Sequence, residues 1–264
     1  MGARALFALA AALLATAPLA AQAAPAFRPL VADPREVGSS IAYLWWDQPE
    51  LDARVVAVGI GDGFDLFRRT DAAGRVIDAE VSAVVLAQFD GSKRSFDFFN
   101  ADFIVGLPVS VRSGPWSARA RLYHWSSHLG DEFLLSSGIE RFEVSLGAVD
   151  LFAAREHRYG RVYAGGELWF TRVPSRLPTW VGHLGAEART PPGMLGARGL
   201  AAVHLRAGEF GAERATGISL RSGIELGRTR PWAILFDYYD GPSPHGQFFD
   251  RMLRWYGLAI RLTV

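Results

Sequence analysis

One short stretch of the sequence, Tyr123-His124-Trp125-Ser126, carries residue types that could perform nucleophilic catalysis. Along a β-strand, side chains two residues apart lie on the same face, so the His124 imidazole and the Ser126 hydroxyl would lie side by side. The imidazole could take the hydroxyl proton as a general base while the serine attacks an ester carbonyl. This spacing predicts a hydrolase site with Ser126 as nucleophile and His124 as base.

Such a pair also needs an acidic side chain that orients the imidazole. On the following strand we take Val144 and Leu146 as outer-face residues, which puts Glu140 on the same face as His124. Antiparallel neighbours bring residues of one face together, so Glu140 is the first candidate for this acid. Glu132, in the connection between the two strands, is the second candidate.

Two other interpretations of this stretch stay open. A lipid hydrolase could use calcium, but the histidines and carboxylates nearby have no diagnostic metal spacing, so no metal or other cofactor is predicted; these residues are His124, His128, Asp131 and Glu132. The simplest interpretation involves no chemistry. In it, His124 and the aromatic residues beside it belong to the belt of aromatic and polar side chains that borders a membrane.

The strand that would carry the pair is predicted over residues 115–127. Its apolar residues share the parity of His124 and Ser126, and are Trp116, Ala118, Ala120 and Leu122. The alternate positions hold Ser117, Arg119 and Arg121. One face of this strand therefore suits lipid and the other a polar interior, which is the pattern of a transmembrane β-barrel.

The same alternation recurs elsewhere in the chain. In the last segment Tyr256, Leu258, Ile260, Leu262 and Val264 alternate with small or polar residues that include Arg261. Inward charges such as this arginine would be costly on an apolar core face unless paired, but they are ordinary in a wet lumen. Asn100 and Asp102 have the inward parity of their strand, and we expect them to join a lumen network with Arg119 and Arg121.

Counting segments between clusters of turn residues predicts an all-β fold, an antiparallel transmembrane barrel of about twelve strands. The predicted strands span residues 38–46, 54–69, 75–89, 96–112, 115–127, 140–153, 159–172, 178–189, 197–207, 215–227, 231–240 and 252–264. The alternatives are a ten-stranded barrel, a soluble β-sandwich and a lipocalin-like barrel. Connections near residues 113, 157 and 229 are short, as periplasmic turns are, whereas 128–139 and 241–251 are longer and predicted to face the exterior.

The first residues have the three-part form of a secretory signal peptide: a basic start, an Ala/Leu-rich run and the small-residue site Ala21-Gln22-Ala23. We therefore predict a signal peptide at residues 1–23, a periplasmic lead-in at 24–37 and a barrel at 38–264, located in the bacterial outer membrane. The chain has no cysteine, which excludes disulfides and thiol chemistry. Its net charge of +1 and the absence of a basic run predict no nucleic-acid partner.

Several motifs resemble a known bacterial family. These are Phe99-Asn100-Ala101-Asp102, Gly106-Leu107-Pro108, Gly114 to Arg119 and Ser126 to Phe133. They are similar to the family called domain of unknown function 1207, and the resemblance covers most of the chain after the signal peptide. It implies an envelope barrel without an established activity.

A local similarity points to a reaction. The His124 and Ser126 pair resembles that of outer-membrane phospholipase A and of the lipid A deacylase, barrel hydrolases with an exterior His-x-Ser pair and a third polar residue on the next strand. This sequence has Ser127 where those enzymes have asparagine, which leaves the oxyanion donor unidentified.

Two functions thus remain open from the sequence. The first is a non-catalytic outer-membrane protein with a narrow barrel, which binds lipid or another ligand or is structural. The second is a lipid acyl hydrolase with an exterior Ser-His-acid site. In both, outer-membrane lipids are the expected partners, and no oligomeric state is predicted.

Overall fold

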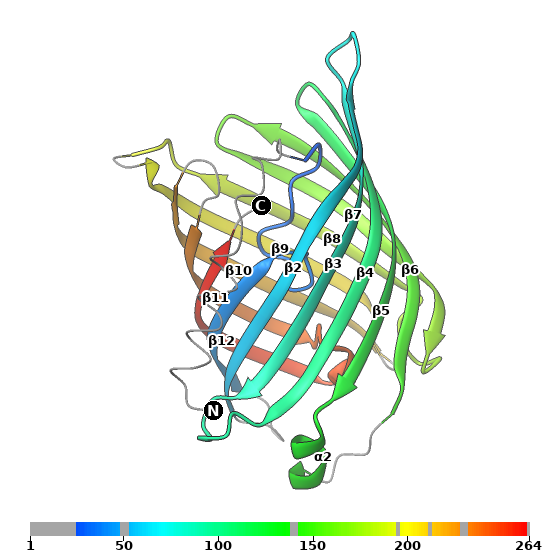
Figure 1. Cartoon of the computed structure of the whole chain (residues 1–264), viewed down its shortest axis with the longest axis vertical. Helices are drawn as coiled ribbons and strands as arrows, with labels where there is room; N and C mark the ends of the chain where they lie inside the picture. Colours follow the sequence, from blue (N-terminus) through cyan, green and yellow to red (C-terminus); the bar gives the residue numbers. More distant parts are fainter. Residues whose placement is uncertain are drawn as a thin grey trace.

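The computed structural model describes residues 25–47, 53–137, 142–193, 196–210, 213–227 and 232–262. Within these residues, twelve antiparallel strands form one closed barrel, in which each strand pairs with the next and β1 pairs with β12 (Figure 1). The predicted all-β barrel is therefore confirmed. In these ranges no helix is long and apolar enough to cross a membrane.

The strands are β1 (Ser39–Asp47), β2 (Ala53–Thr70), β3 (Val76–Asp90), β4 (Phe98–Ser113), β5 (Trp116–Leu129), β6 (Val144–His157), β7 (Gly160–Val173), β8 (Trp180–Arg189), β9 (Arg198–Phe210), β10 (Glu213–Leu226), β11 (Trp232–Pro242) and β12 (Met252–Leu262). A short helix α2 (Asp131–Ser137) follows β5, and a 3-10 turn η2 (Gly246–Phe248) precedes β12. β1 begins and β12 ends at the side of the short hairpins, which we call the hairpin end. The opposite side, with α2 and η2, is the loop end.

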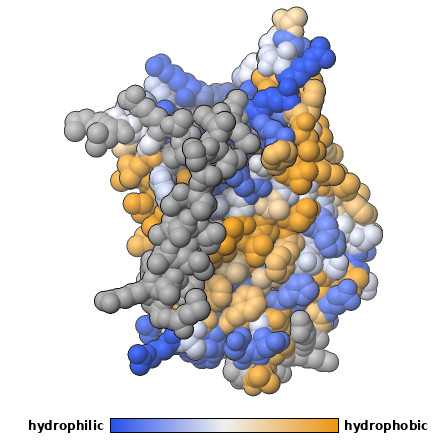
Figure 2. Space-filling model, in the orientation of Figure 1, coloured by the Kyte–Doolittle hydropathy of each residue, from blue (hydrophilic) through white to orange (hydrophobic). Residues whose placement is uncertain are grey.

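The outer face of the barrel is apolar because the strands alternate as predicted. In β5, Trp116 and Leu122 are exposed while Arg119 and Arg121 are buried inside. In β7, Leu168 is exposed and its neighbour in sequence, Trp169, is buried. Figure 2 shows many apolar side chains on the visible wall. An apolar outer face of this kind suits contact with the hydrocarbon core of a membrane, and the polar side chains point into the lumen.

β6 contradicts the predicted facing of its first residues. Val144 and Leu146 point into the barrel, each 1% exposed, and Ser145 lies on the outer face between them. Val144 and Leu146 belong to an apolar cluster around Trp125 and Trp169 inside the lumen. Because the lumen is apolar at this end, apolar residues of β6 could not be assigned to the outer face from hydropathy alone. The predicted start of this strand at Glu140 lies outside the described residues.

Two segments of the chain lie inside the barrel. Residues 25–38, which we call the N-terminal plug, enter from the hairpin end, and Leu30 and Ala32 in it are fully buried. Figure 1 shows this segment in dark blue within the ring of strands. Residues 243–251, which we call the inner loop, fill the loop end with buried side chains that include Phe248. The sequence predicted a periplasmic lead-in at 24–37 and an exterior loop at 241–251, whereas residues 25–37 and 243–249 lie in the lumen.

The wall has one free strand edge at the hairpin end. β2 continues over residues 61–70 beyond the start of β1 and there pairs only with β3. The carboxylate of Asp62 accepts a hydrogen bond from the Gly63 N–H at 2.8 Å, and a bulge between Asp65 and Phe67 interrupts the edge. A charge and a bulge both discourage pairing with a foreign strand. Protection of this free edge explains why the acidic side chain of Asp62 lies on the otherwise apolar outer face.

The facing of β6 can be tested with single cysteines, because the chain contains none. We expect Ser145→Cys to react with a maleimide in the folded, detergent-solubilised barrel, because its side chain points outward. Leu146→Cys should stay unmodified until the barrel is unfolded, because residue 146 is 1% exposed. Fast labelling of Leu146→Cys in the folded state would show that residue 146 points outward, as predicted from the sequence.

Candidate functional site

The structure brings His124 and Ser126 together on the outer face of β5. His124 is exposed and Ser126 is half-buried, and both follow Leu122 on the apolar side of the strand. No hydrogen bond joins the two side chains in the described part of the chain. The pair has the predicted side-by-side placement, but it lacks the hydrogen bond through which the serine would pass its proton to the imidazole.

Register decides which side chains surround this pair. His124 lies opposite Val105 on β4 and Gly147 on β6. Ser126 lies opposite Phe103 on β4 and Ser145 on β6. No described carboxylate therefore stands directly beside the imidazole across either strand.

The predicted orienting acids do not complete the site in the described residues. Glu132 is exposed in the first turn of α2, beyond the end of β5. Glu140 lies outside the described residues. Ser127 faces the lumen, where its hydroxyl accepts a hydrogen bond from the Gln247 N–H at 3.1 Å. No set of three or more histidine and acidic side chains in the described ranges is arranged to hold a metal ion.

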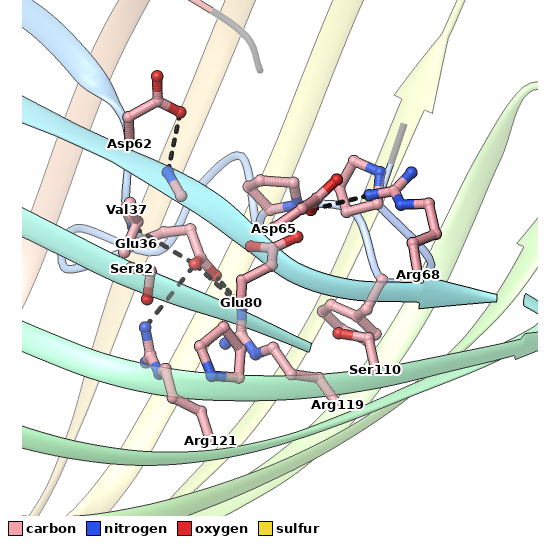
Figure 3. A pocket seen from close by; sticks show the side chains of 15 residues that line it. Glu36, Val37, Asp62, Asp65, Arg68, Glu80, Ser82, Ser110, Arg119 and Arg121 are labelled. Atoms are coloured by element: carbon pink, nitrogen blue, oxygen red, sulfur yellow. Dashed lines mark hydrogen bonds and ion pairs between the residues drawn. The ribbon is translucent and has the colours of Figure 1, made fainter. Parts of the chain in front are cut away.

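The largest concentration of polar contacts lies inside the barrel, between its wall and the N-terminal plug. Arg119 donates from one nitrogen to both carboxylate oxygens of Glu36 at 3.0 Å, and Arg121 pairs with Asp150 at 2.6 Å. All four side chains are at most 6% exposed. Figure 3 shows Glu36 reaching from the plug toward these arginines beside a cavity of about 90 Å³ that Glu80 also lines.

The wall also binds the backbone of the plug. Arginines of the wall donate hydrogen bonds to backbone carbonyl groups of residues 25–31. These arginines are Arg112, Arg161, Arg221 and Arg261. Carboxylates accept from its N–H groups, Asp78 from Ala26 at 2.6 Å and Glu187 from Val31 at 2.9 Å. An extended segment inside a barrel has no strand partner, so these side chains satisfy its backbone.

Glu167 on β7 is the centre of a second group of contacts. Its carboxylate pairs with Arg35 of the plug at 2.6 Å and accepts hydrogen bonds from Tyr123 and Trp169, each at 2.6 Å. His183 stands 3.0 Å from the same carboxylate. The chain of contacts continues from His183 to His204 and from His204 to Tyr163, each at 3.0 Å.

At the loop end the central side chain is Asp102. It accepts hydrogen bonds from the Trp125 indole at 3.1 Å and from the Gly246 N–H at 3.0 Å, and His245 lies 3.3 Å away. Asn100 donates to it at 3.4 Å. The expected network of Asn100 and Asp102 with Arg119 and Arg121 is thus wrong in its partners: Trp125 and the inner loop bind Asp102 instead.

Sequence reasoning missed the plug and the inner loop as occupants of the lumen. A signal was present in Asp33-Pro34-Arg35-Glu36, where three charges follow an apolar stretch directly before the first strand. Sequence offers no register between such a segment and twelve strands, so the partners of these charges could not be assigned. For His245 and Gln247 we find no sequence signal.

Comparison with known proteins agrees with the fold. Residues 2–263 match the family described as "Protein of unknown function (DUF1207)". The chain belongs to this family. No curated protein matches it in sequence.

Solved structures of outer-membrane barrels are similar to this member of the family. An active-site mutant of outer membrane phospholipase A from Escherichia coli aligns with a TM-score of 0.64 at 11% identity, over 96% of both chains. The calcium-bound dimer of the phospholipase from Salmonella typhi aligns with a TM-score of 0.61 at 12% identity, also over 96% of both chains. At such identities the likeness concerns the barrel alone.

We expect Glu36→Ala to destabilise the barrel by about 3–5 kcal/mol, because it leaves two buried arginines, Arg119 and Arg121, with the single carboxylate of Asp150. The free energy of unfolding from urea titration of the refolded protein measures this. The control is the exposed pair of Arg214 and Glu209, where Glu209→Ala should cost at most about 1 kcal/mol. A loss for Glu36→Ala as small as for the control would show that the plug is not held by this pair.

Proposed function

We propose that this family member is an integral outer-membrane protein whose barrel is plugged by its own chain and does not conduct. Its role is structural or lies in binding lipid or another ligand, and it is non-catalytic. The outer-membrane location rests on the likeness of the barrel to outer-membrane barrels and on the apolar outer face. Outer-membrane lipids are its proposed partners through that face.

The observation that carries the proposal is the occupied lumen. The N-terminal plug is held to the wall by ion pairs through Arg35 and Glu36, and its backbone is bound along residues 25–31. The inner loop fills the other end, with Gln247 bonded to the backbone of Ser127 at 2.7 Å. An ion could cross only by displacing these segments and breaking buried pairs, each of which costs several kcal/mol to break.

A conductance measurement tests this directly. We expect the refolded protein in planar lipid bilayers to be silent, because plug and inner loop occupy both ends of the lumen. A variant that lacks residues 25–37 and has residues 243–249 replaced by a short glycine-serine linker should show current steps, since both segments that occupy the lumen are then removed. Glu209→Ala, which alters only an exposed pair, should stay silent. Stable current steps in the unaltered protein would overturn the plugged barrel.

A second function is supported by one observation, the shared outer face of His124 and Ser126. In that proposal the protein is a lipid acyl hydrolase of the phospholipase or lipid A deacylase type. Ser126 attacks an ester carbonyl of a lipid in the surrounding membrane, and His124 takes the hydroxyl proton. Glu140 or Glu132 would orient the imidazole, and calcium could be required.

The hydrolase proposal predicts that the refolded barrel releases fatty acid from phospholipid or lipid A. Ser126→Ala and His124→Ala should each lower the rate by about a thousandfold or more, as for other serine nucleophiles and their bases. His128→Ala, also on the outer face of β5, is the matched control and should retain activity. The assay is run with calcium and with a chelator. If the folded protein releases no fatty acid either with calcium or with the chelator, the hydrolase proposal is wrong and the non-catalytic function stands.

A further inference from the structure

A small cavity remains in the lumen beside the N-terminal plug. Its volume is about 70 Å³, well above the roughly 15 Å³ that one water needs. Apolar side chains of β1, β2, β11 and β12 line most of it, among them Ala42, Leu44, Ala57, Leu235 and Ala259. Arg221 and Arg261 line the same cavity, as does Gln88.

The register explains why the space exists. Ala259 on β12 lies opposite Ala42 on β1, which lies opposite Ala57 on β2, which lies opposite Gln88 on β3. Three alanines in one row across the wall leave room that larger inward side chains fill elsewhere. The row runs along the wall toward Gln88, so the cavity is elongated across the strands.

Two guanidinium groups converge at one side of this cavity. Arg221 and Arg261 each donate to the carbonyl oxygen of Val31, at 2.7 and 2.9 Å. Arg221 also pairs with Asp237 at 2.8 Å, but Arg261 has no carboxylate partner among the described residues. Arg261 is partly buried, and a cation partly removed from water is stabilised by a nearby opposite charge. The arrangement therefore has the capacity to bind an anion.

The far side of the cavity offers an unused polar group. Gln88 is 2% exposed, and the carbonyl oxygen of its side chain has no hydrogen-bond partner in the described part of the protein. A buried amide without partners costs free energy, and such groups in folded proteins are nearly always satisfied. Since Gln88 lines the cavity, a bound molecule can supply the missing hydrogen bonds.

We propose that this cavity is a binding site for a small organic carboxylate with a second polar group. The carboxylate binds Arg261 and Arg221, a body of a few carbon atoms lies against the alanine row, and a hydroxyl group bonds the Gln88 amide. Arginine suits this role because its planar group donates two parallel hydrogen bonds to a carboxylate. The site is separate from the outer face of His124 and does not depend on whether the lumen conducts.

Binding is measured by isothermal titration of the full-length, refolded protein in detergent. The probes are 4-hydroxybutyrate, butyrate, 1-butanol and inorganic phosphate. We expect 4-hydroxybutyrate to bind at least about tenfold more tightly than 1-butanol, because the alcohol lacks the charge that the arginines recognise. Butyrate should fall between them, since it lacks the hydroxyl group that meets Gln88.

Three variants locate the site. Arg261→Gln should weaken carboxylate binding by about tenfold or more, because the unpaired cation is lost. Gln88→Leu should abolish the preference of the site for the hydroxy acid over butyrate. Arg206→Gln is the control: this lumen arginine stacks on Phe210 and does not line the cavity, so binding should be unchanged.

The outcomes separate clearly. No binding of either carboxylate to the folded protein, or equal affinities for butyrate and 1-butanol, would overturn the proposal and leave a cavity that holds water only. Tighter binding of phosphate than of both carboxylates would overturn the assigned ligand class. Arg261→Gln could fail to fold, which the loss of heat-modifiable gel migration would reveal. In that case the proposal is tested by the affinities of the probes for the unaltered protein and by the loss of hydroxy-acid preference in Gln88→Leu.

Discussion

The structure depends on the pairing of charges inside the barrel. A twelve-stranded wall that presents apolar side chains to lipid sends its arginines and carboxylates inward, where they need partners. Some partners come from neighbouring strands, as with Arg121 and Asp150. Others come from the N-terminal plug, as with Arg119 and Glu36. The plug is thus a structural part of the barrel interior and not an appendage to it.

This constraint also explains why the lumen has two different regions. Near the hairpin end the wall is charged and holds the plug through side chains and backbone. Near the loop end it is aromatic, and the inner loop packs there with His245 stacked on Trp46 at 5.4 Å. Asp102 receives several donors at the loop end, and Glu167 receives several beside the plug. Both ends are closed by chain segments whose polar groups find partners in the wall.

The outer face raises a separate question. His124 and Ser126 share a lipid-facing surface on a barrel similar to outer-membrane phospholipase A, yet the positions across from His124 hold Val105 and Gly147. A fold shared at 11% identity does not bring a catalytic site with it. A histidine and a serine on an outer face can equally belong to the polar border of the membrane. The position of an orienting acid is what separates the two possibilities.

The sequence by itself predicted a barrel of about twelve strands, with ten left open, and the facing of β5, because alternation with period two records which side of a strand meets lipid. It also determined that His124 and Ser126 share one face. Only the tertiary structure decided the facing of Val144 and Leu146, since an apolar lumen and an apolar exterior give a strand the same hydropathy. It alone decided that residues 25–38 fill the lumen, because the pairing of a plug with a wall depends on contacts between segments far apart in sequence, which no local pattern encodes.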